Sequence, residues 1–141
     1  MSLPERCRRV NECCRQLGKD NVLLISIHCN AAGRGDRWLT ARGWCAYTTR
    51  GNTRADALAT ALYIAAQIHI PDHRLRMDWT DKDPDIESNF YLLPHTACPA
   101  VLTENMFMDA KADCDFLLSP EGQQALIDLH VTGIKFYLAI R

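Results

Sequence analysis

The sequence predicts an α/β fold in which helices flank a mostly parallel, twisted sheet in three layers. Short runs of branched and aromatic residues alternate with longer stretches of helical periodicity along the 141 residues. The most hydrophobic run, residues 21–27, is apolar on both faces, as is typical of a buried parallel strand. Apolar residues make up 48% of the chain, which is enough to bury one core, so residues 1–141 are expected to form a single domain.

Local signals place the elements of the first half. Pro4 suits a first helical turn, and Gly18 stands where a C-terminal cap would. Thr53 is a helix cap, and Pro71 stops the helix that Thr53 begins. The predicted elements are, in order, helix 4–17, strand 21–27, strand 43–49 and helix 53–69.

The second half contains a long charged segment followed by alternating short elements. Residues 72–88 carry one proline and many charges, and long loops within compact domains are often functional. Ser119-Pro120 marks the start of a final helix. The predicted elements after the loop are strand 90–93, strand 100–103, helix 110–118 and helix 119–140.

Two reactive side chains follow two of these strands. His28 ends the most hydrophobic strand, and Glu104 ends the strand of residues 100–103. Ligands of open α/β sheets bind beyond the carboxyl ends of the strands, where such side chains can converge. Imidazole suits zinc, and a nearby carboxylate can accept a proton from water. Spacing alone leaves open that His28 is a hydrogen-bonded loop residue and Glu104 a solvated one.

Composition excludes several classes of protein. The net charge is -1, without a basic stripe, which argues against a nucleic-acid partner. No apolar run approaches the roughly 20 residues that span a bilayer. Seven cysteines without a C-x-x-C pair favour buried free thiols over a zinc ribbon or a disulfide framework. The chain has no signal peptide, Met1 to Leu3 are interpreted as a start added for expression, and an N-terminal truncation is expected.

Two longer strings carry a family resemblance. Residues 26–31, Ser-Ile-His-Cys-Asn-Ala, resemble the S-I-H-x-N-A signature of the zinc-dependent N-acetylmuramoyl-L-alanine amidases (amidase type 3). Residues 99–107, Pro-Ala-Val-Leu-Thr-Glu-Asn-Met-Phe, are similar to their P-A-V-L-x-E-x-x-F segment. The helix before the first motif, the glycine-led strand after it and the closing helix fall in the family's order, so the resemblance spans nearly the whole chain.

The resemblance implies an activity and two roles. His28 corresponds to a histidine that binds the single zinc ion, and Glu104 to the general base that acts on water. The implied substrate is the amide bond between N-acetylmuramic acid and L-alanine in peptidoglycan, during cell-wall turnover or lysis. The implied location is the cell envelope, either periplasmic or extracellular.

The chain also departs from the family. Members begin with a strand ending in a G-H-G-G-like motif, and neither its histidine nor a downstream acidic ligand appears here, since Glu5 and Glu12 are interpreted as helix-surface residues. We therefore expect the first strand and the other zinc ligands to be missing, and residues 1–141 to bind zinc weakly without activity. Cys29, beside His28, could bind metal as a thiolate, but a buried neutral thiol is favoured. His95 could line the cleft or be a plain loop histidine.

Three further expectations complete the interpretation. The alternative to an enzyme is a non-catalytic peptidoglycan-binding or regulatory domain derived from an amidase. A sheet without its first strand would expose an edge, through which the chain could form homo-oligomers. The loop of residues 74–87 could help to recognise the substrate through Arg74, Arg76, Trp79 or Glu87, and a solvated loop is the alternative for each of these residues.

Overall fold

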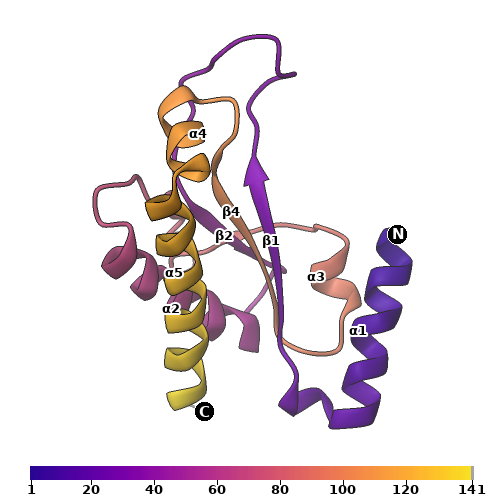
Figure 1. Ribbon diagram of the computed structural model, residues 1–141. Helices are drawn as coiled ribbons and strands as arrows, with labels where there is room; N and C mark the ends of the chain where they lie inside the picture. Colours follow the sequence, from indigo (N-terminus) through magenta and orange to yellow (C-terminus); the bar gives the residue numbers. More distant parts are fainter. Residues whose placement is uncertain (141) are drawn as a thin grey trace.

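Helices cover both faces of a four-stranded mixed sheet in the computed structural model, which describes residues 1–140 (Figure 1). In chain order the elements are α1 (Leu3–Leu17), η1 (Lys19–Asn21), β1 (Leu24–Asn30), β2 (Cys45–Thr48), α2 (Arg54–His69), β3 (Ile86–Glu87), α3 (Leu92–His95), β4 (Ala100–Phe107), α4 (Lys111–Leu118) and α5 (Pro120–Ala139). None of the described helices is long and apolar enough to cross a membrane.

The sheet has the strand order β1-β4-β2-β3. The pairs β1–β4 and β2–β3 are parallel, and β2 runs antiparallel to β4. Figure 1 shows α2, α4 and α5 on one side of the strands and α1 and α3 on the other. The α/β prediction with three layers is therefore confirmed, with a mixed sheet that is parallel in two of its three pairings.

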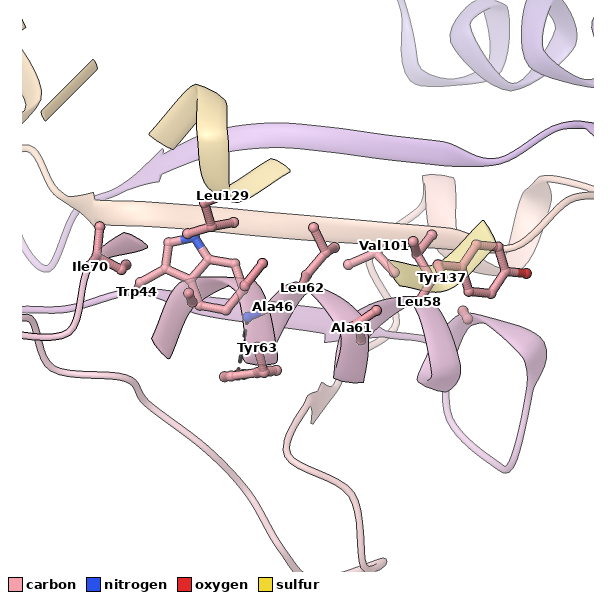
Figure 2. Close-up of a cluster of buried hydrophobic side chains, with 14 of the residues drawn as sticks. Trp44, Ala46, Leu58, Ala61, Leu62, Tyr63, Ile70, Val101, Leu129 and Tyr137 are labelled. Atoms are coloured by element: carbon pink, nitrogen blue, oxygen red, sulfur yellow. Dashed lines mark hydrogen bonds between the residues drawn. The ribbon is translucent and has the colours of Figure 1, made fainter. Parts of the chain in front are cut away.

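The main core fills the space between the sheet and helices α2 and α5 (Figure 2). Trp44, immediately before β2, and Leu62 of α2 are fully buried there, as are Val101 of β4 and Leu129 of α5. Helices α2 and α5 approach closely at Gly133, where an added Cβ would lie 2.6 Å from Leu62 Cδ2. These side chains hold β4, and with it Glu104, against the two longest helices.

Predicted helix starts are confirmed by their caps. Thr53 Oγ1 accepts a hydrogen bond from the Ala55 amide, and Asp56 accepts one from the Thr53 amide, which completes a capping box. Ser119 Oγ accepts the amide of Gly122 at the start of α5. Side-chain acceptors at these positions satisfy amides that have no partner within the helix, so the local sequence sets where α2 and α5 begin.

The predicted strand 90–93 is wrong, because these residues form a turn that leads into the short helix α3. The Leu93 amide donates to Phe90 O, and Thr96 Oγ1 donates to Leu92 O, which are local bonds rather than strand pairing. Leu92 and Leu93 are both buried, at 6% and 3% exposure. A short apolar run is ambiguous between helix and strand when only its periodicity is known.

Strand β1 differs from its prediction in bounds and in burial. It begins at Leu24 and continues to Asn30, and none of its residues is buried. Ile27 is 63% exposed. The reason is its place in the sheet, since β1 pairs only with β4 among the described strands and is therefore an edge. The prediction of an exposed sheet edge is confirmed, whereas the prediction of a buried strand is wrong.

Candidate active site

Strand pairing brings three reactive side chains side by side. His28 of β1 is the register partner of Glu104 of β4, and Cys45 of β2 pairs with Glu104 from the other side. Side chains at paired positions of neighbouring strands lie on the same face of a sheet. The predicted convergence of His28 and Glu104 is thus present. Both residues lie inside their strands, rather than at the strand ends as predicted, because β1 continues for two residues past His28 and β4 for three past Glu104.

Glu104 has an environment suited to proton transfer. The residue is partly exposed, but its Oε2 is buried without a hydrogen-bond partner. Burial raises the pKa of the Glu104 carboxyl, and the nearby charge of His28 opposes this rise. A carboxyl whose pKa is shifted from the usual range towards neutrality is better matched to general acid–base work.

His28 is exposed but held in place by its neighbours. Ser26 Oγ lies 2.9 Å from His28 Nε2, within hydrogen-bonding distance. The carbonyl oxygen of His28 accepts a hydrogen bond of 2.9 Å from Asn105 Nδ2. Both the ring and the backbone are therefore oriented before any ligand binds.

An irregularity in β4 lies next to Glu104. His28 pairs with Glu104, whereas Asn30 pairs with Phe107, so β4 contains one more residue than β1 over this stretch. Met106 lies in this bulge, is fully buried and has a φ of 65°. That conformation costs an L-residue about 1–2 kcal/mol. Bulges and strained residues concentrate at functional sites, where they re-aim side chains.

Asn105 is a positioning residue that the sequence analysis missed. Its side chain is 2% exposed and bridges two elements. Oδ1 accepts a hydrogen bond of 2.9 Å from Trp44 Nε1, while Nδ2 donates to the carbonyl of His28. The available signal was the pair of polar residues Glu104-Asn105 within an apolar strand, since successive residues of a strand point to opposite faces.

Replacing Asn105 with alanine is expected to lower the free energy of unfolding by about 2–3 kcal/mol, because the Trp44 indole N–H and the His28 carbonyl would lose their partner. Urea unfolding followed by tryptophan fluorescence measures the change. Asn89→Ala is the matched control, since Asn89 is exposed. Equal unfolding midpoints for Asn105→Ala and the unmodified chain would contradict this role.

Two buried aspartates anchor the loop between β1 and β2. Asp109 Oδ2 accepts the amides of Ala32 and Gly33 at 2.8 and 2.7 Å. Asp113 accepts hydrogen bonds from Arg42 Nε and from the Gly43 and Phe107 amides. Burial raises the pKa of the Asp113 carboxyl, but these hydrogen bonds outweigh it and lower the pKa overall. No sequence signal marked these acids, which hold the loop beside the end of β4.

The four loop residues considered as substrate contacts have different surroundings. Arg76 lies with its guanidinium carbon 5.2 Å from the centre of the Phe107 ring. Burial raises the pKa of Cys45 to about 11, and the charge of Arg76 partly opposes this rise. Arg74 uses its carbonyl oxygen to accept the Trp44 amide. Glu87 accepts the Gly51 amide at 2.6 Å, and Trp79 is 61% exposed. Of these four side chains, Arg76 is the one whose charge acts on Cys45, the β2 partner of Glu104.

Two other candidate residues, His95 and Cys29, are not part of the group formed by His28, Glu104 and Cys45. His95 lies on α3, with its ring stacked on Tyr91 and its carbonyl accepting Asn11 Nδ2 of α1, which fits a plain structural histidine. Cys29 is exposed, so the prediction of a buried thiol there is wrong. Partial burial, followed by the charge of Glu104, raises the pKa of Cys29, which keeps the thiol neutral. Cys29 follows His28 on β1, an edge strand that pairs only with β4 among the described strands.

The remaining cysteines and the α1 glutamates largely match expectation. Cys7, Cys14, Cys45 and Cys98 are buried free thiols, whereas Cys13 is exposed and Cys114 half-buried. Glu5 pairs with two arginines of α1, and Glu12 with a third, as helix-surface residues do.

The donor set for a metal ion is incomplete. A structural or catalytic zinc site takes at least three protein ligands. Across residues 1–140, no group of three His, Cys, Asp or Glu side chains is placed to hold a metal ion. His28 and Glu104 by themselves therefore do not fit a zinc ion.

Comparison with known proteins supplies independent information. The family model described as N-acetylmuramoyl-L-alanine amidase matches residues 1–136. No curated protein matches the sequence.

Solved structures share the fold. An N-acetylmuramoyl-L-alanine amidase from Clostridium difficile 630 has a TM-score of 0.79 at 22% identity, over 99% of this chain and 66% of that one. AmiC2 of Nostoc punctiforme has a TM-score of 0.75 at 23% identity, over 99% and 67%. Ami1 from Mycobacterium smegmatis has a TM-score of 0.75 at 20% identity, over 99% and 61%. The chain thus spans about two thirds of the length of these structures.

Proposed function

The chain belongs to the N-acetylmuramoyl-L-alanine amidase family, and from this we propose that it forms part of an enzyme that hydrolyses the amide bond between N-acetylmuramic acid and L-alanine in peptidoglycan. The observation that supports this proposal most directly is the pairing of His28 with Glu104 on adjacent parallel strands. This pair puts a carboxylate with one unsatisfied buried oxygen beside an imidazole that its neighbours orient.

Glu104 has the role of general base in the proposed reaction. Its carboxylate takes a proton from the attacking water and returns it to the leaving amine of L-alanine, so the proton balance closes within one turnover. The partly buried position and raised pKa of Glu104 make the protonated carboxyl a competent donor in the second step. Arg76, close to this strand, is proposed to contact the substrate.

Zinc is the metal that we propose for the complete site, with His28 as one ligand. A zinc ion would polarise the amide carbonyl and acidify a water molecule. Because His28 and Glu104 do not complete a ligand set, the other ligands are proposed to come from a segment outside residues 1–141. Residues 1–141 alone are accordingly expected to bind zinc weakly, which isothermal titration with His28→Ala as comparison can measure.

The proposed setting is the cell envelope, where peptidoglycan is found. The free edge of β1 is the proposed surface for self-association, because an exposed edge offers unpaired amides and carbonyls to another strand. Light scattering at increasing concentration tests this, and a mass that stays at one protomer would contradict it.

The test of function compares residues 1–141 with the longest natural gene product that contains them. Purified peptidoglycan is incubated with each protein, and newly exposed amino groups of L-alanine are quantified. The longer protein is expected to release them, to stop when zinc is chelated, and to recover when zinc is restored. Residues 1–141 alone are expected to be inactive. Peptidoglycan binding by the longer protein without any release would support the alternative, a non-catalytic domain.

A further inference from the structure

Two cysteine side chains lie next to each other where α1 meets the segment 95–99, which leads into β4. Cys14 of α1 and Cys98 of this segment are 5% and 6% exposed, and both are free thiols. The two thiols are within hydrogen-bonding reach of each other, although more than half of the chain separates them in the sequence. Neither residue belongs to the candidate active site.

Asn11 of α1 binds the segment 95–99 beside this contact. Its Nδ2 donates a hydrogen bond of 2.9 Å to the carbonyl oxygen of His95, and its Oδ1 accepts one of 2.8 Å from the amide of Ala97. Residues three apart on a helix lie on the same face, so Cys14 faces the segment that Asn11 binds. Cys14 and Ala97 accordingly line the same cavity.

The backbone is fixed on both sides of Cys98. Ala97 is bound by Asn11, and the carbonyl oxygen of Pro99 accepts a hydrogen bond of 2.9 Å from the amide of Leu24, where β1 begins. The Cys98 side chain is therefore held beside α1 by contacts that exist before any oxidation. A disulfide forms only between cysteines that the fold brings close together, and this pair meets that condition.

Each of the two thiols borders a cavity. Cys14 lines one of about 440 Å³ together with Arg15 and Lys19. Cys98 lines another of about 320 Å³, to which Lys19 and Arg54 contribute. Basic side chains around both cavities favour the approach of an anionic oxidant, of which oxidised glutathione is an example.

We propose that Cys14 and Cys98 form a reversible disulfide bond that fastens α1 to the segment 95–99, with a small disulfide such as oxidised glutathione as the oxidant. The Cys14 sulfur attacks one sulfur of the oxidant and releases one molecule of reduced glutathione. Cys98 then loses its proton, and its sulfur displaces the second glutathione from Cys14. Two electrons pass from the protein thiols to the oxidant, so the products are one protein disulfide and two glutathione thiols.

This oxidation is expected to be slow. Burial, followed by the hydrogen bond with Cys14, raises the pKa of Cys98 to about 12. The thiolate is the attacking species in disulfide exchange, and little of it forms on Cys98 near neutral pH. The bond should therefore form over hours. Such a bond persists in an oxidising compartment, and the proposal does not rest on the proposed hydrolysis.

The test equilibrates residues 1–141 with reduced and oxidised glutathione at pH 7.5, blocks free thiols by alkylation and maps the unreduced peptides by mass spectrometry. Trypsin releases residues 10–15, which contain Cys13 and Cys14, and residues 83–111, in which Cys98 is the single cysteine. Cys13→Ser is the matched control, because Cys13 is exposed and precedes Cys14 directly. In this variant a link from residues 10–15 can come only from Cys14.

Thermal unfolding measures what the bond does to stability. The oxidised chain is expected to have a Tm about 10 °C above that of the reduced chain, because the bond closes a long loop in the unfolded state. In Cys14→Ala and Cys98→Ala, the Tm values with and without oxidant should agree within about 1 °C.

The peptide map and the Tm together decide. A link between residues 10–15 and 83–111 that persists in Cys13→Ser, together with the rise in Tm, supports the proposal. Alkylated or glutathione-bound Cys98 in the most oxidising buffer would overturn it, as would a link from Cys98 to any other cysteine or an unchanged Tm. If the alanine variants do not fold, the map and the Tm of Cys13→Ser give the answer.

Discussion

Replacing Glu104 with glutamine in the longest natural gene product is expected to lower kcat for peptidoglycan hydrolysis by about 10²–10⁴-fold, the usual contribution of a general base. Glutamine has nearly the same shape but cannot accept and return a proton. KM should change little, because the amide preserves the shape and polarity of the side chain. The initial rate at saturating substrate, measured through released amino groups, gives the change in kcat.

The Glu104→Gln result is interpretable because the substitution should leave the fold intact. Oε2 has no hydrogen-bond partner to lose, so the unfolding temperature should stay close to that of the unmodified protein. Glu121→Gln is the control, since Glu121 lies exposed in the first turn of α5. A kcat within threefold of the unmodified value in Glu104→Gln would remove Glu104 from the mechanism.

The largest loss of stability is expected for Trp44→Ala, which should lower the free energy of unfolding by about 3–5 kcal/mol. Trp44 is fully buried in the core, where its ring meets Tyr63 edge-on at 4.9 Å between centroids (Figure 2). Its Nε1 donates a hydrogen bond to Asn105 Oδ1. Alanine would leave a cavity in the centre of the core and an unpaired Asn105 Oδ1. Since a domain of this size is stable by about 5–15 kcal/mol, this loss would remove a large part of its stability.

Two further variants separate the causes of this loss. Trp44→Phe keeps an aromatic ring but removes the indole donor, and about 1–3 kcal/mol is expected for the unsatisfied Asn105 oxygen. Trp79→Ala removes a tryptophan that is 61% exposed and should change stability by less than about 0.5 kcal/mol. Urea unfolding followed by circular dichroism compares all three. Similar losses for Trp44→Ala and Trp79→Ala would contradict the assignment of Trp44 to the core.

Local sequence predicted the helices well because their signals act within a few residues. The caps at Thr53 and Ser119 place the starts of α2 and α5, since each side chain satisfies amides of its own first turn. The run 90–93 was assigned to a strand because four apolar residues fit either period. Burial of Leu92 and Leu93 against the sheet decided for a helix, and that burial depends on distant residues.

The residues of the candidate site were likewise predicted only in part. The strings around His28 and Glu104 identified both residues, although the ends of their strands were placed too early. Asn105, Asp109 and Asp113 escaped notice because most of their hydrogen-bond partners lie 61 to 77 residues away in the sequence, and only folding brings them together. Asp85 stood in a segment expected to be a solvated or substrate-binding loop, whereas it is almost completely buried.

The sequence by itself determined the family, the α/β class and the two residues proposed for the reaction, because motifs and helix caps consist of residues that are neighbours in the sequence. Tertiary structure alone decided that β1 is an edge, that Asn105 ties the His28 backbone to Trp44, and that the Asp85 carboxyl is buried beside Thr48. Each of these features depends on strand order and packing between distant segments. Such contacts form only when the hydrophobic core is packed, so no local sequence pattern indicates them.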